Sequence, residues 1–334
     1  MTLRVGVIGT GNIGADHVRR IAAGIAGAVV SAVTDVDTAR AEEVGRSVGA
    51  TVCADGRALI AAAEVDAVII ASPSKTHAAL TLACISAGKP VLCEKPLAPT
   101  TKECIEVLDA EVALGRRLVQ VGFMRRYDSG YRAVKAALTD GLIGQPLILH
   151  NVHRNPTVPA SFSSDMTITD AIIHEIDTTR WLLGEEIVSA QVIPPAPTPL
   201  AHPHLQDPQF VVFRTERGLL STVECFVNCQ YGYDVRCELV GSTGTASLVN
   251  PVVAAVTLEG ADRAAVPADW RVRFGAAYHA ELQDWVNGLL NGVVRGPNAW
   301  DGYAATRVAQ AGVESATSGE RVALDSIPKP ALYA

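Results

Sequence analysis

Two stretches of the sequence carry side chains suited to acid–base chemistry. Asp170, His174 and Asp177 would share one face of an α-helix, and an imidazole beside carboxylates can act as a general base near neutral pH. Lys95 follows a short apolar strand and precedes a proline, where its ammonium could stabilise negative charge that develops on an oxygen. The alternative for both stretches is an ordinary solvated surface, with an incidental histidine and a lysine at a strand end.

A neighbouring strand adds polar side chains that suit hydroxyl groups. His153 and Asn155 fall on the same strand face, because side chains alternate between the two faces. Metal binding is the competing use of such groups, but no His-x₃-His or Cys-x₂-Cys spacing supports it. His202 and His204 lie in a Pro-rich loop. We therefore expect no catalytic metal.

The N-terminal part of the chain contains a glycine-rich turn of the G-x-G-x-x-G pattern. It lies between a strand and a helix, so its glycines permit a tight turn, a close approach of a pyrophosphate, and close packing of helix on strand. Asp35 ends the second strand, where a carboxylate accepts hydrogen bonds from an adenosine ribose and repels a 2′-phosphate. The pattern predicts a site for NAD rather than NADP; the alternative is a plain turn followed by a turn-forming aspartate. The residues of the turn are Gly9, Thr10, Gly11, Asn12, Ile13 and Gly14.

Two further loops should border the same edge of the sheet. Ser72 and Pro73 end one apolar strand, with His77 shortly after, and Glu94 and Lys95 end the next. Ligands of open parallel sheets bind beyond the carboxyl ends of the strands, so we expect these residues to border the cofactor. For His77, an ordinary place in the first turn of a helix is an equal alternative.

The elements that must position these residues follow from hydrophobic periodicity. In the first 120 residues, strand-like and helix-like runs alternate, which predicts βαβ units and a parallel sheet of the Rossmann type. The expected strands are 3–8, 29–33, 66–71, 90–93 and 118–121, and the expected helices are 12–23, 38–48, 76–87 and 100–114.

The pattern changes after residue 122. Successive strand-like runs with short turns between 187 and 258 indicate a largely antiparallel sheet. We therefore predict a Rossmann domain over 1–122 and a substrate-binding and oligomerisation α/β domain over 123–334. The other expected elements are a strand at 147–154 and helices at 131–138, 168–183, 278–290 and 299–316.

Composition excludes several classes of protein. The 334 residues are 49% hydrophobic and only 5% aromatic, with a formal net charge of −7, so nucleic-acid binding is not expected. No run of 18 apolar residues predicts a membrane span, and the N-terminal residues lack the features of a signal peptide. The seven scattered cysteines favour reduced thiols and a cytoplasmic protein.

Taken together, these motifs resemble the Gfo/Idh/MocA oxidoreductase family. The resemblance rests on the turn at 9–14, on Asp35, on the Glu-Lys-Pro run at 94–96 and on the Asp-x₃-His-Glu-Ile-Asp run at 170–177. It extends over nearly the whole chain and is greatest to bacterial members that act on inositols. It implies NAD as cofactor and a C-terminal α/β domain with an open, mostly antiparallel sheet. The exposed face of that sheet would pack subunits into a homodimer or homotetramer.

The resemblance also implies roles for individual residues. Lys95, Asp170 and His174 would form the catalytic group. The reaction implied is oxidation of myo-inositol to 2-keto-myo-inositol. Other polyols or sugars, such as scyllo-inositol, a chiro-inositol or a glucose-type aldose, stay open, as does a regulatory protein that binds a dinucleotide without turnover. The residues expected to contact the polyol are Lys95, Met124, Arg125, His153, Asn155, Asp170, His174, Asp177 and Tyr233.

Overall fold

The computed structural model describes residues 2–248, 255–258 and 260–334, which form two compact units. The first unit comprises Met1–Phe123, Tyr278–Thr306 and Pro328–Ala334, and the second comprises Met124–Ala277 and Arg307–Ile327. The chain first passes from one unit to the other between Phe123 and Met124. Two later segments nevertheless pack with the first unit, so packing units and consecutive sequence differ. The division into functional domains at residue 122 stays a prediction.

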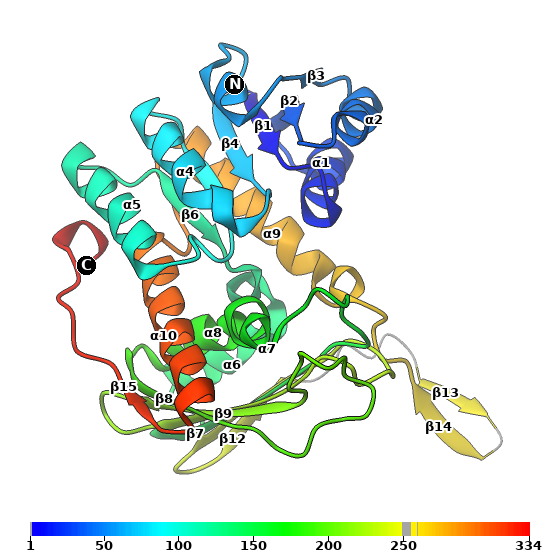
Figure 1. Cartoon of the computed structure of the whole chain (residues 1–334), viewed down its shortest axis with the longest axis vertical. Coiled ribbons are helices and arrows are strands. Elements are labelled where there is room, and N and C mark those ends of the chain that lie inside the picture. The colour runs from blue at the N-terminus through cyan, green and yellow to red at the C-terminus, as the bar shows by residue number, and fades with distance from the viewer. Residues whose placement is uncertain (1, 249–254, 259) are drawn as a thin grey trace. The chain divides into compact units, whose positions relative to one another are not determined.

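The first unit is built on a six-stranded sheet with all pairs parallel, which confirms the predicted Rossmann-type fold (Figure 1). The spatial order of its strands is β3-β2-β1-β4-β5-β6. The prediction missed two short elements, β3 and α3. The strands are β1 (Leu3–Ile8), β2 (Ala28–Thr34), β3 (Thr51–Val52), β4 (Ala67–Ile70), β5 (Val91–Glu94) and β6 (Val119–Gly122). The helices are α1 (Asn12–Gly24), α2 (Thr38–Val48), α3 (Gly56–Ala61), α4 (His77–Ser86) and α5 (Thr101–Leu114), with a 3₁₀ turn η1 (Ser74–Thr76).

Local sequence signals set the ends of these helices. The side chains of Asp37, Asp55 and Thr100 accept hydrogen bonds from backbone N–H groups in the first turns of α2, α3 and α5. Helices α2 and α5 end at Gly49 and Gly115, whose φ values of 70° and 72° glycine adopts without steric cost. The helix boundaries over 38–48 and 100–114 were therefore predictable to within a residue.

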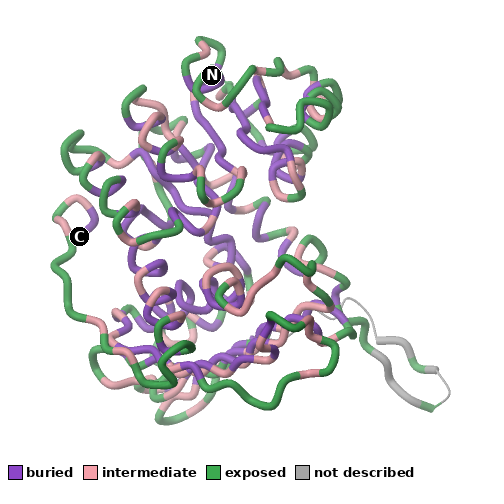
Figure 2. The backbone as a smooth tube through the Cα atoms, in the orientation of Figure 1, coloured by how far each residue is buried: buried purple, intermediate pink, exposed green. Residues whose placement is uncertain are grey.

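Both faces of this sheet are covered, which explains the continuous apolar strands. Val5 and Val7 contribute to a buried cluster that includes Trp285, while Gly6 faces the opposite side, where a Cβ would lie 2.5 Å from the Leu59 side chain. Figure 2 shows buried residues concentrated along the strands. A strand buried on both faces holds its carboxyl end in a fixed position, which the loops beyond it require.

The second unit contains a seven-stranded mixed sheet of order β12-β11-β7-β10-β9-β8-β15. Its pairs are antiparallel except β7 with β10, which are parallel, so the largely antiparallel prediction is confirmed. A two-stranded hairpin pairs β13 (Ala255–Leu258) with β14 (Ala261–Ala264). The strands of the large sheet are β7 (Pro146–Arg154), β8 (Ile187–Ile193), β9 (Gln209–Thr215), β10 (Leu220–Phe226), β11 (Asp234–Gly241), β12 (Thr245–Ser247) and β15 (Val322–Ala323).

One predicted helix of this unit is wrong in its first turn. The pattern over 168–183 predicts a regular α-helix, but Thr167–Ile172 forms a π-helical turn, η3, that leads into α8 (Ile173–Leu183). Periodicity near 3.6 cannot distinguish one widened turn from an α-turn, because the flanking apolar residues stay buried in both. The remaining helices are η2 (Met124–Tyr127), α6 (Ser129–Thr139), α7 (Ser164–Met166), α9 (Trp270–Leu290), α10 (Ala299–Ser318) and η4 (Ala331–Tyr333).

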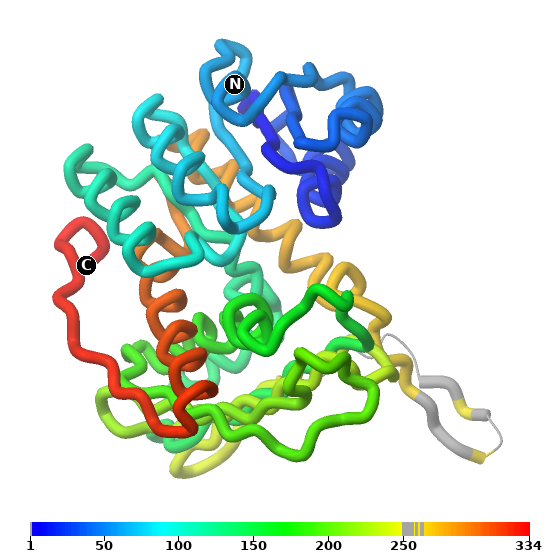
Figure 3. The backbone as a smooth tube through the Cα atoms, in the orientation of Figure 1, coloured from blue at the N-terminus to red at the C-terminus, as the bar shows by residue number. Residues whose placement is uncertain are grey.

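The last residues of the chain pack with the first unit. The hydroxyl of Tyr333 donates to Glu111 Oε2 at 2.8 Å, and both residues are buried. Figure 3 shows the red C-terminal end beside the turquoise helix α5, which carries Glu111. None of the described helices combines the length and the apolar composition that crossing a bilayer requires.

Candidate active site

The glycine-rich turn has the conformation that a bound pyrophosphate requires. Gly9 has a φ of +91°, and a Cβ there would lie 2.6 Å from the backbone nitrogen of Ser72. At Gly14, a Cβ would lie 1.9 Å from the Gly9 carbonyl oxygen. Gly11, in contrast, faces open space within 4 Å and begins α1 without a side-chain cap. The open N-terminus of α1 therefore presents N–H groups to an anion, so these residues fit the phosphates of a dinucleotide.

Asp35 lies beside this turn and is held by four protein donors. Its Oδ2 accepts hydrogen bonds from Thr10 N (2.6 Å) and Thr10 Oγ1 (3.1 Å), and its Oδ1 accepts from Asp37 N and Arg40 Nη2, both at 2.9 Å. Burial alone would raise the pKa of this carboxyl, but the hydrogen bonds from Arg40, Asp37 and Thr10 outweigh burial and lower the pKa to about 2. Asp35 is therefore fully ionised at neutral pH. Its contact with a ribose stays a prediction.

His77 connects two of the loops at the same edge. Its ring is buried, with Nε2 2.8 Å from the Ser72 carbonyl oxygen and Nδ1 2.7 Å from that of Pro96. Carbonyl oxygens only accept, and a neutral imidazole can donate to only one of them. Because both ring nitrogens face backbone groups, His77 braces the loops that contain Ser72, Pro73 and Lys95. Its predicted role in cofactor binding would act through that support.

Glu94 is the last residue of β5, and Lys95 follows it in the loop beyond the strand. Glu94 is buried, and its Oε1 lies 2.7 Å from Nε2 of His17, a fully buried residue of α1. The backbone N–H of Lys95 donates to Glu94 Oε2 at 3.3 Å, and the Lys95 side chain is half-buried. Sequence reasoning missed His17, although its place three residues after Gly14 on the first helix is a usable signal. The dyad of His17 and Glu94 fixes the backbone from which Lys95 projects.

Asp170, His174 and Asp177 come from the π-turn and from α8 in the second unit. Asp170 lies within the π-turn. Because this turn is wider than an α-turn, the Asp170 side chain has a different angular position around the helix axis, relative to His174, than it would have in a regular α-helix. His174 is buried at 7% exposure. Asp177 is buried at 1% exposure and accepts two hydrogen bonds from Arg126, at 2.9 and 2.5 Å. The structure therefore gives the Asp177 carboxylate a cationic partner that sequence reasoning did not identify.

A buried triad of charged groups supports His153. Arg125, Glu175 and His153 are at most 3% exposed. Arg125 donates to Glu175 Oε1, and His153 Nδ1 lies 3.1 Å from Glu175 Oε2. Burial raises the pKa of Glu175, but the charge of Arg125 and the hydrogen bonds from His153 and Arg125 outweigh burial and lower the pKa, so the carboxylate is ionised. A carboxylate only accepts, so Nδ1 carries a proton and the 3.3 Å approach of Arg125 Nη2 to Nδ1 is not a hydrogen bond.

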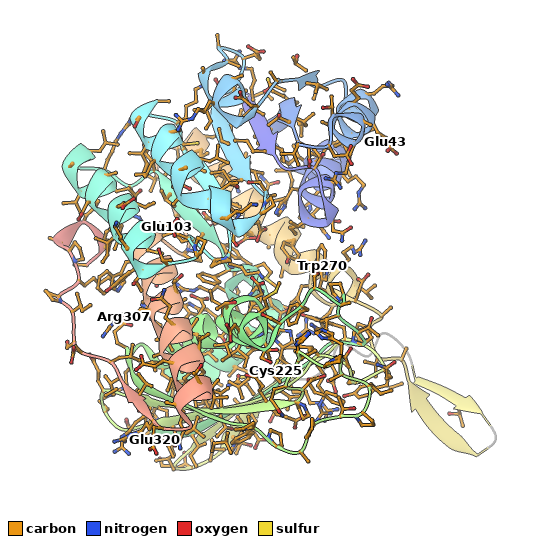
Figure 4. All side chains as sticks on the ribbon, viewed as in Figure 1. Glu43, Glu103, Cys225, Trp270, Arg307 and Glu320 are labelled. Carbon is orange, nitrogen blue, oxygen red and sulfur yellow. The ribbon has the colours of Figure 1, made fainter. Side chains whose placement is uncertain are left out.

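This assignment leaves His153 Nε2 as an acceptor. It makes no hydrogen bond with the residues that the structure describes. His153 lies opposite Cys225 in the β7–β10 ladder, and Cys225 is labelled in Figure 4. The ring of Tyr233 meets that of His153 edge-on at 5.9 Å. Arg154 points to the other face, where it pairs with Glu224 at 2.6 Å, as strand alternation predicts. Glu175, which sets the histidine tautomer, was missed by sequence reasoning.

The other predicted polyol contacts lie in the same unit. Met124 is buried at 2% exposure. The backbone of Asn155 is fixed by a hydrogen bond from its N–H to the Phe226 carbonyl oxygen at 3.0 Å. Its side-chain Oδ1 is buried and has no hydrogen-bond partner among the described residues, which is consistent with a ligand contact. Within the described ranges, no group of three or more His, Cys, Asp or Glu side chains has the arrangement of a metal site.

The comparisons with known proteins cover both halves of the chain. Residues 3–123 match the GFO_IDH_MocA model, described as an oxidoreductase family with an NAD-binding Rossmann fold, and residues 135–324 match its C-terminal α/β domain. The chain belongs to the Gfo/Idh/MocA oxidoreductase family. The predicted resemblance is thus confirmed, and NAD is the cofactor of the domain that contains the glycine-rich turn.

Several proteins that are similar to this chain over its whole length are named as inositol dehydrogenases. The chain is 52% identical to inositol 2-dehydrogenase 3 of Saccharopolyspora erythraea, over 100% of this chain and 98% of that protein. It is 50% identical to the inositol 2-dehydrogenase of Pseudomonas savastanoi pv. phaseolicola, over 100% of both. Among solved structures of the family, myo-inositol dehydrogenase from Lactobacillus casei, in complex with NAD(H) and myo-inositol, superposes with a TM-score of 0.97 at 37% identity, with 100% of both chains covered.

A second similar structure is that of an enzyme named for another stereoisomer of inositol. Scyllo-inositol dehydrogenase from Lactobacillus casei, with bound NAD(H) and scyllo-inositol, gives a TM-score of 0.90 at 26% identity, covering 97% of this chain and 99% of that one. The fold is therefore shared by enzymes that act on different inositols. Side chains of the site, and not the fold, must distinguish the substrates.

Proposed function

We propose that this chain is an NAD-dependent inositol 2-dehydrogenase that oxidises myo-inositol to 2-keto-myo-inositol. The observation that carries the proposal is similarity over the entire length, at about 50% identity to relatives named inositol 2-dehydrogenase and with a TM-score of 0.97 to a myo-inositol dehydrogenase. The intact Lys95 and His174 favour an enzyme over a regulatory protein that only binds a dinucleotide.

The first unit supplies the residues that would hold the cofactor. The turn from Gly9 to Gly14 offers backbone N–H groups to the pyrophosphate, and Asp35 offers a carboxylate to the adenosine ribose. Ser72 and Glu94 border the same edge of the sheet. When bound, NAD supplies the acceptor for a hydride.

The proton chemistry is assigned to three side chains. His174 takes the proton of the substrate hydroxyl as general base, while the carbon of that hydroxyl gives up its hydride. Lys95 donates a hydrogen bond to the same oxygen and stabilises its negative charge until the ketone has formed. Asp170 orients the substrate and His174 through hydrogen bonds. Joint action of these three residues on one substrate is inferred from the family resemblance.

The polar groups of the second unit suit a neutral, densely hydroxylated ring. Each buried hydroxyl left unpaired costs about 1–3 kcal/mol, so such a ring needs several acceptors and donors. His153 and Asn155 each offer a side-chain acceptor. Arg125 and Arg126 are already paired with carboxylates, so neither suits a substrate carboxylate in the way a 2-hydroxy acid would require. A polyol therefore fits better than an acid.

A panel of substrates tests this proposal. Purified protein is mixed with NAD⁺ or NADP⁺ and with myo-inositol, scyllo-inositol, D-chiro-inositol or glucose, and NAD(P)H absorbance is followed. Myo-inositol with NAD⁺ should give the highest kcat/KM, and each mispaired hydroxyl should lower kcat/KM roughly tenfold or more. Turnover of glucose but not of myo-inositol would move the chain to a sugar dehydrogenase. Binding of NADH without turnover of any polyol would favour the regulatory alternative.

Self-association is a second part of the proposal. The outer face of the large sheet in the second unit carries exposed apolar side chains, among them Ile193 at 45% and Leu220 at 37% exposure. A face of this kind is suited to packing against a second copy of the chain. Sedimentation analysis of the purified protein should give a dimer or tetramer, and a monomer at micromolar concentration would contradict this part.

A further inference from the structure

The carboxylate of Asp35 has no acceptor position left for a ligand. An ionised carboxylate offers about four lone-pair positions. Thr10 N and Thr10 Oγ1 use those of Oδ2, at 2.6 and 3.1 Å, while Asp37 N and Arg40 Nη2 use those of Oδ1, both at 2.9 Å. A ribose hydroxyl that donates to Asp35 must therefore replace one of these protein donors.

Arg40 is the donor that can be replaced. The N–H groups of Thr10 and Asp37 belong to backbone that the fold holds in place, and Thr10 is buried at 1% exposure. The Arg40 side chain is 44% exposed, and exposed ion pairs contribute little to stability. The start of α2 does not depend on its guanidinium, because the cap uses the backbone N–H of Arg40, which donates to Asp37 Oδ1 at 3.1 Å.

We propose that Arg40 is a specificity-determining residue for the cofactor, which competes with the adenosine ribose for Asp35 and offers a cation to a 2′-phosphate. A guanidinium is a good partner for phosphate, and its charge offsets the repulsion that Asp35 exerts. Without Arg40, the carboxylates of Asp35 and Asp37 would act together, since Arg40 Nη1 also lies 3.9 Å from Asp37 Oδ2. The proposal rests on Asp35 as the ribose-binding residue.

Binding measurements with Arg40→Ala test this inference without any polyol. Dissociation constants of NADH and NADPH are determined by fluorescence titration at two salt concentrations. The Kd of NADH should fall about two- to fivefold, as expected for release of an exposed ion pair. The Kd of NADPH should rise by about the same factor or more, so selectivity for NADH increases by roughly tenfold. The salt dependence of NADPH binding should also change sign or weaken, because the cation is gone.

Two variants separate this role from a general effect. Arg46→Ala removes another exposed arginine of α2 and should leave both Kd values unchanged. Arg40→Lys keeps the positive charge and should keep most NADPH binding. Thermal unfolding checks that each variant is folded. If Arg40→Ala weakens NADH and NADPH equally, Arg40 is an ordinary dinucleotide contact, and if neither Kd changes it has no role; either result overturns the inference. Because no substrate is present, the outcome does not depend on whether myo-inositol is the substrate.

Discussion

Ion pairs inside the second unit decide which polar atoms a ligand can use. Arg125 donates to Glu175, and Arg126 donates to Asp177. Both guanidinium groups therefore lose much of their capacity for a charged ligand, whereas His153 keeps Nε2 as an acceptor. At the scale of single residues, the unit is organised for neutral hydroxyl groups.

Removing either proposed catalytic side chain should abolish most turnover. We expect His174→Ala and Lys95→Ala each to lower kcat about 10²-fold or more, the usual scale for a positioned acid–base or oxyanion partner. NADH binding, measured by fluorescence, should survive both changes because the glycine-rich turn is untouched. Near-normal turnover in His174→Ala would contradict the mechanism.

The buried triad predicts a large effect on stability. Glu175→Gln removes the negative charge and leaves the Arg125 charge buried without its counter-ion. Loss of one partner of a buried pair costs about 3–5 kcal/mol, so the free energy of unfolding in urea should fall by about that amount. Glu224→Gln is the matched control, because the pair of Glu224 with Arg154 is partly exposed and should contribute about 0–1 kcal/mol. Equal effects of the two variants would contradict the assignment.

The lowered pKa of Asp35 predicts a pH dependence with a definite sign. Its folded pKa of about 2 lies below the unfolded value of about 3.9, so ionised Asp35 stabilises the fold above pH 4. This contribution is lost as the pH falls from about 4 to about 2. We expect the difference in free energy of unfolding between the wild type and Asp35→Asn to shrink over that range. A difference that stays constant from pH 7 to pH 2 would refute the ionised, hydrogen-bonded state.

At the scale of elements, the π-turn at Thr167–Ile172 sets the rotation of Asp170 relative to α8. Such turns contain one residue more than the α-turn they replace and recur at functional sites. The first turn of the predicted helix therefore has a geometry that sequence periodicity does not reveal.

Removing one residue from this turn should damage catalysis more than folding. Deletion of Thr169 removes the extra residue of the π-turn, so the turn becomes closer to a regular α-turn. The residues before the deletion then rotate about the helix axis relative to α8. Small misplacements of reacting groups can cost about 10²-fold, so we expect kcat to fall by tenfold or more. Thr169→Ala keeps the length of the turn and should retain near-normal kcat. Retained NADH binding and retained circular dichroism would show that the deletion variant is folded; a normal kcat would contradict a role for the turn.

At the scale of the whole molecule, the chain enters and leaves each compact unit more than once. Helices α9 and α10 each contribute residues to both units, and the last residues return to the first. Each unit is therefore built from segments that are far apart in the sequence, and the C-terminal residues are part of the cofactor-binding unit.

The hydrogen bond between Tyr333 and Glu111 joins the C-terminal residues to α5 of the first unit, so its removal tests how much this contact stabilises the fold. Tyr333→Phe removes the donor and should lower the free energy of unfolding by about 1–2 kcal/mol while leaving kcat unchanged. A double-mutant cycle with Glu111→Gln should give a coupling energy of about 0.5–3 kcal/mol. Strict additivity of the two changes would show that the contact does not contribute.

Local sequence was sufficient for much of the first unit. The alternation of strands and helices and the turn from Gly9 to Gly14 depend on local backbone conformation and on which side chains are buried, and a few neighbouring residues are enough to indicate both. The short elements at 51–52 and 56–61 were not predicted, because they contain too few residues to show a hydrophobic periodicity.

Tertiary structure alone decided the partners of the polar groups. Glu175 and Arg125 are 50 residues apart and His17 and Glu94 are 77 apart, and no periodic pattern relates positions so distant. The π-turn and the parallel pairing of β7 with β10 were likewise not expected from the sequence. The physical reason is that the periodicity of the sequence indicates only which side chains are buried. Which charged partner lies next to a buried polar group depends on the tertiary fold, which brings distant parts of the chain together.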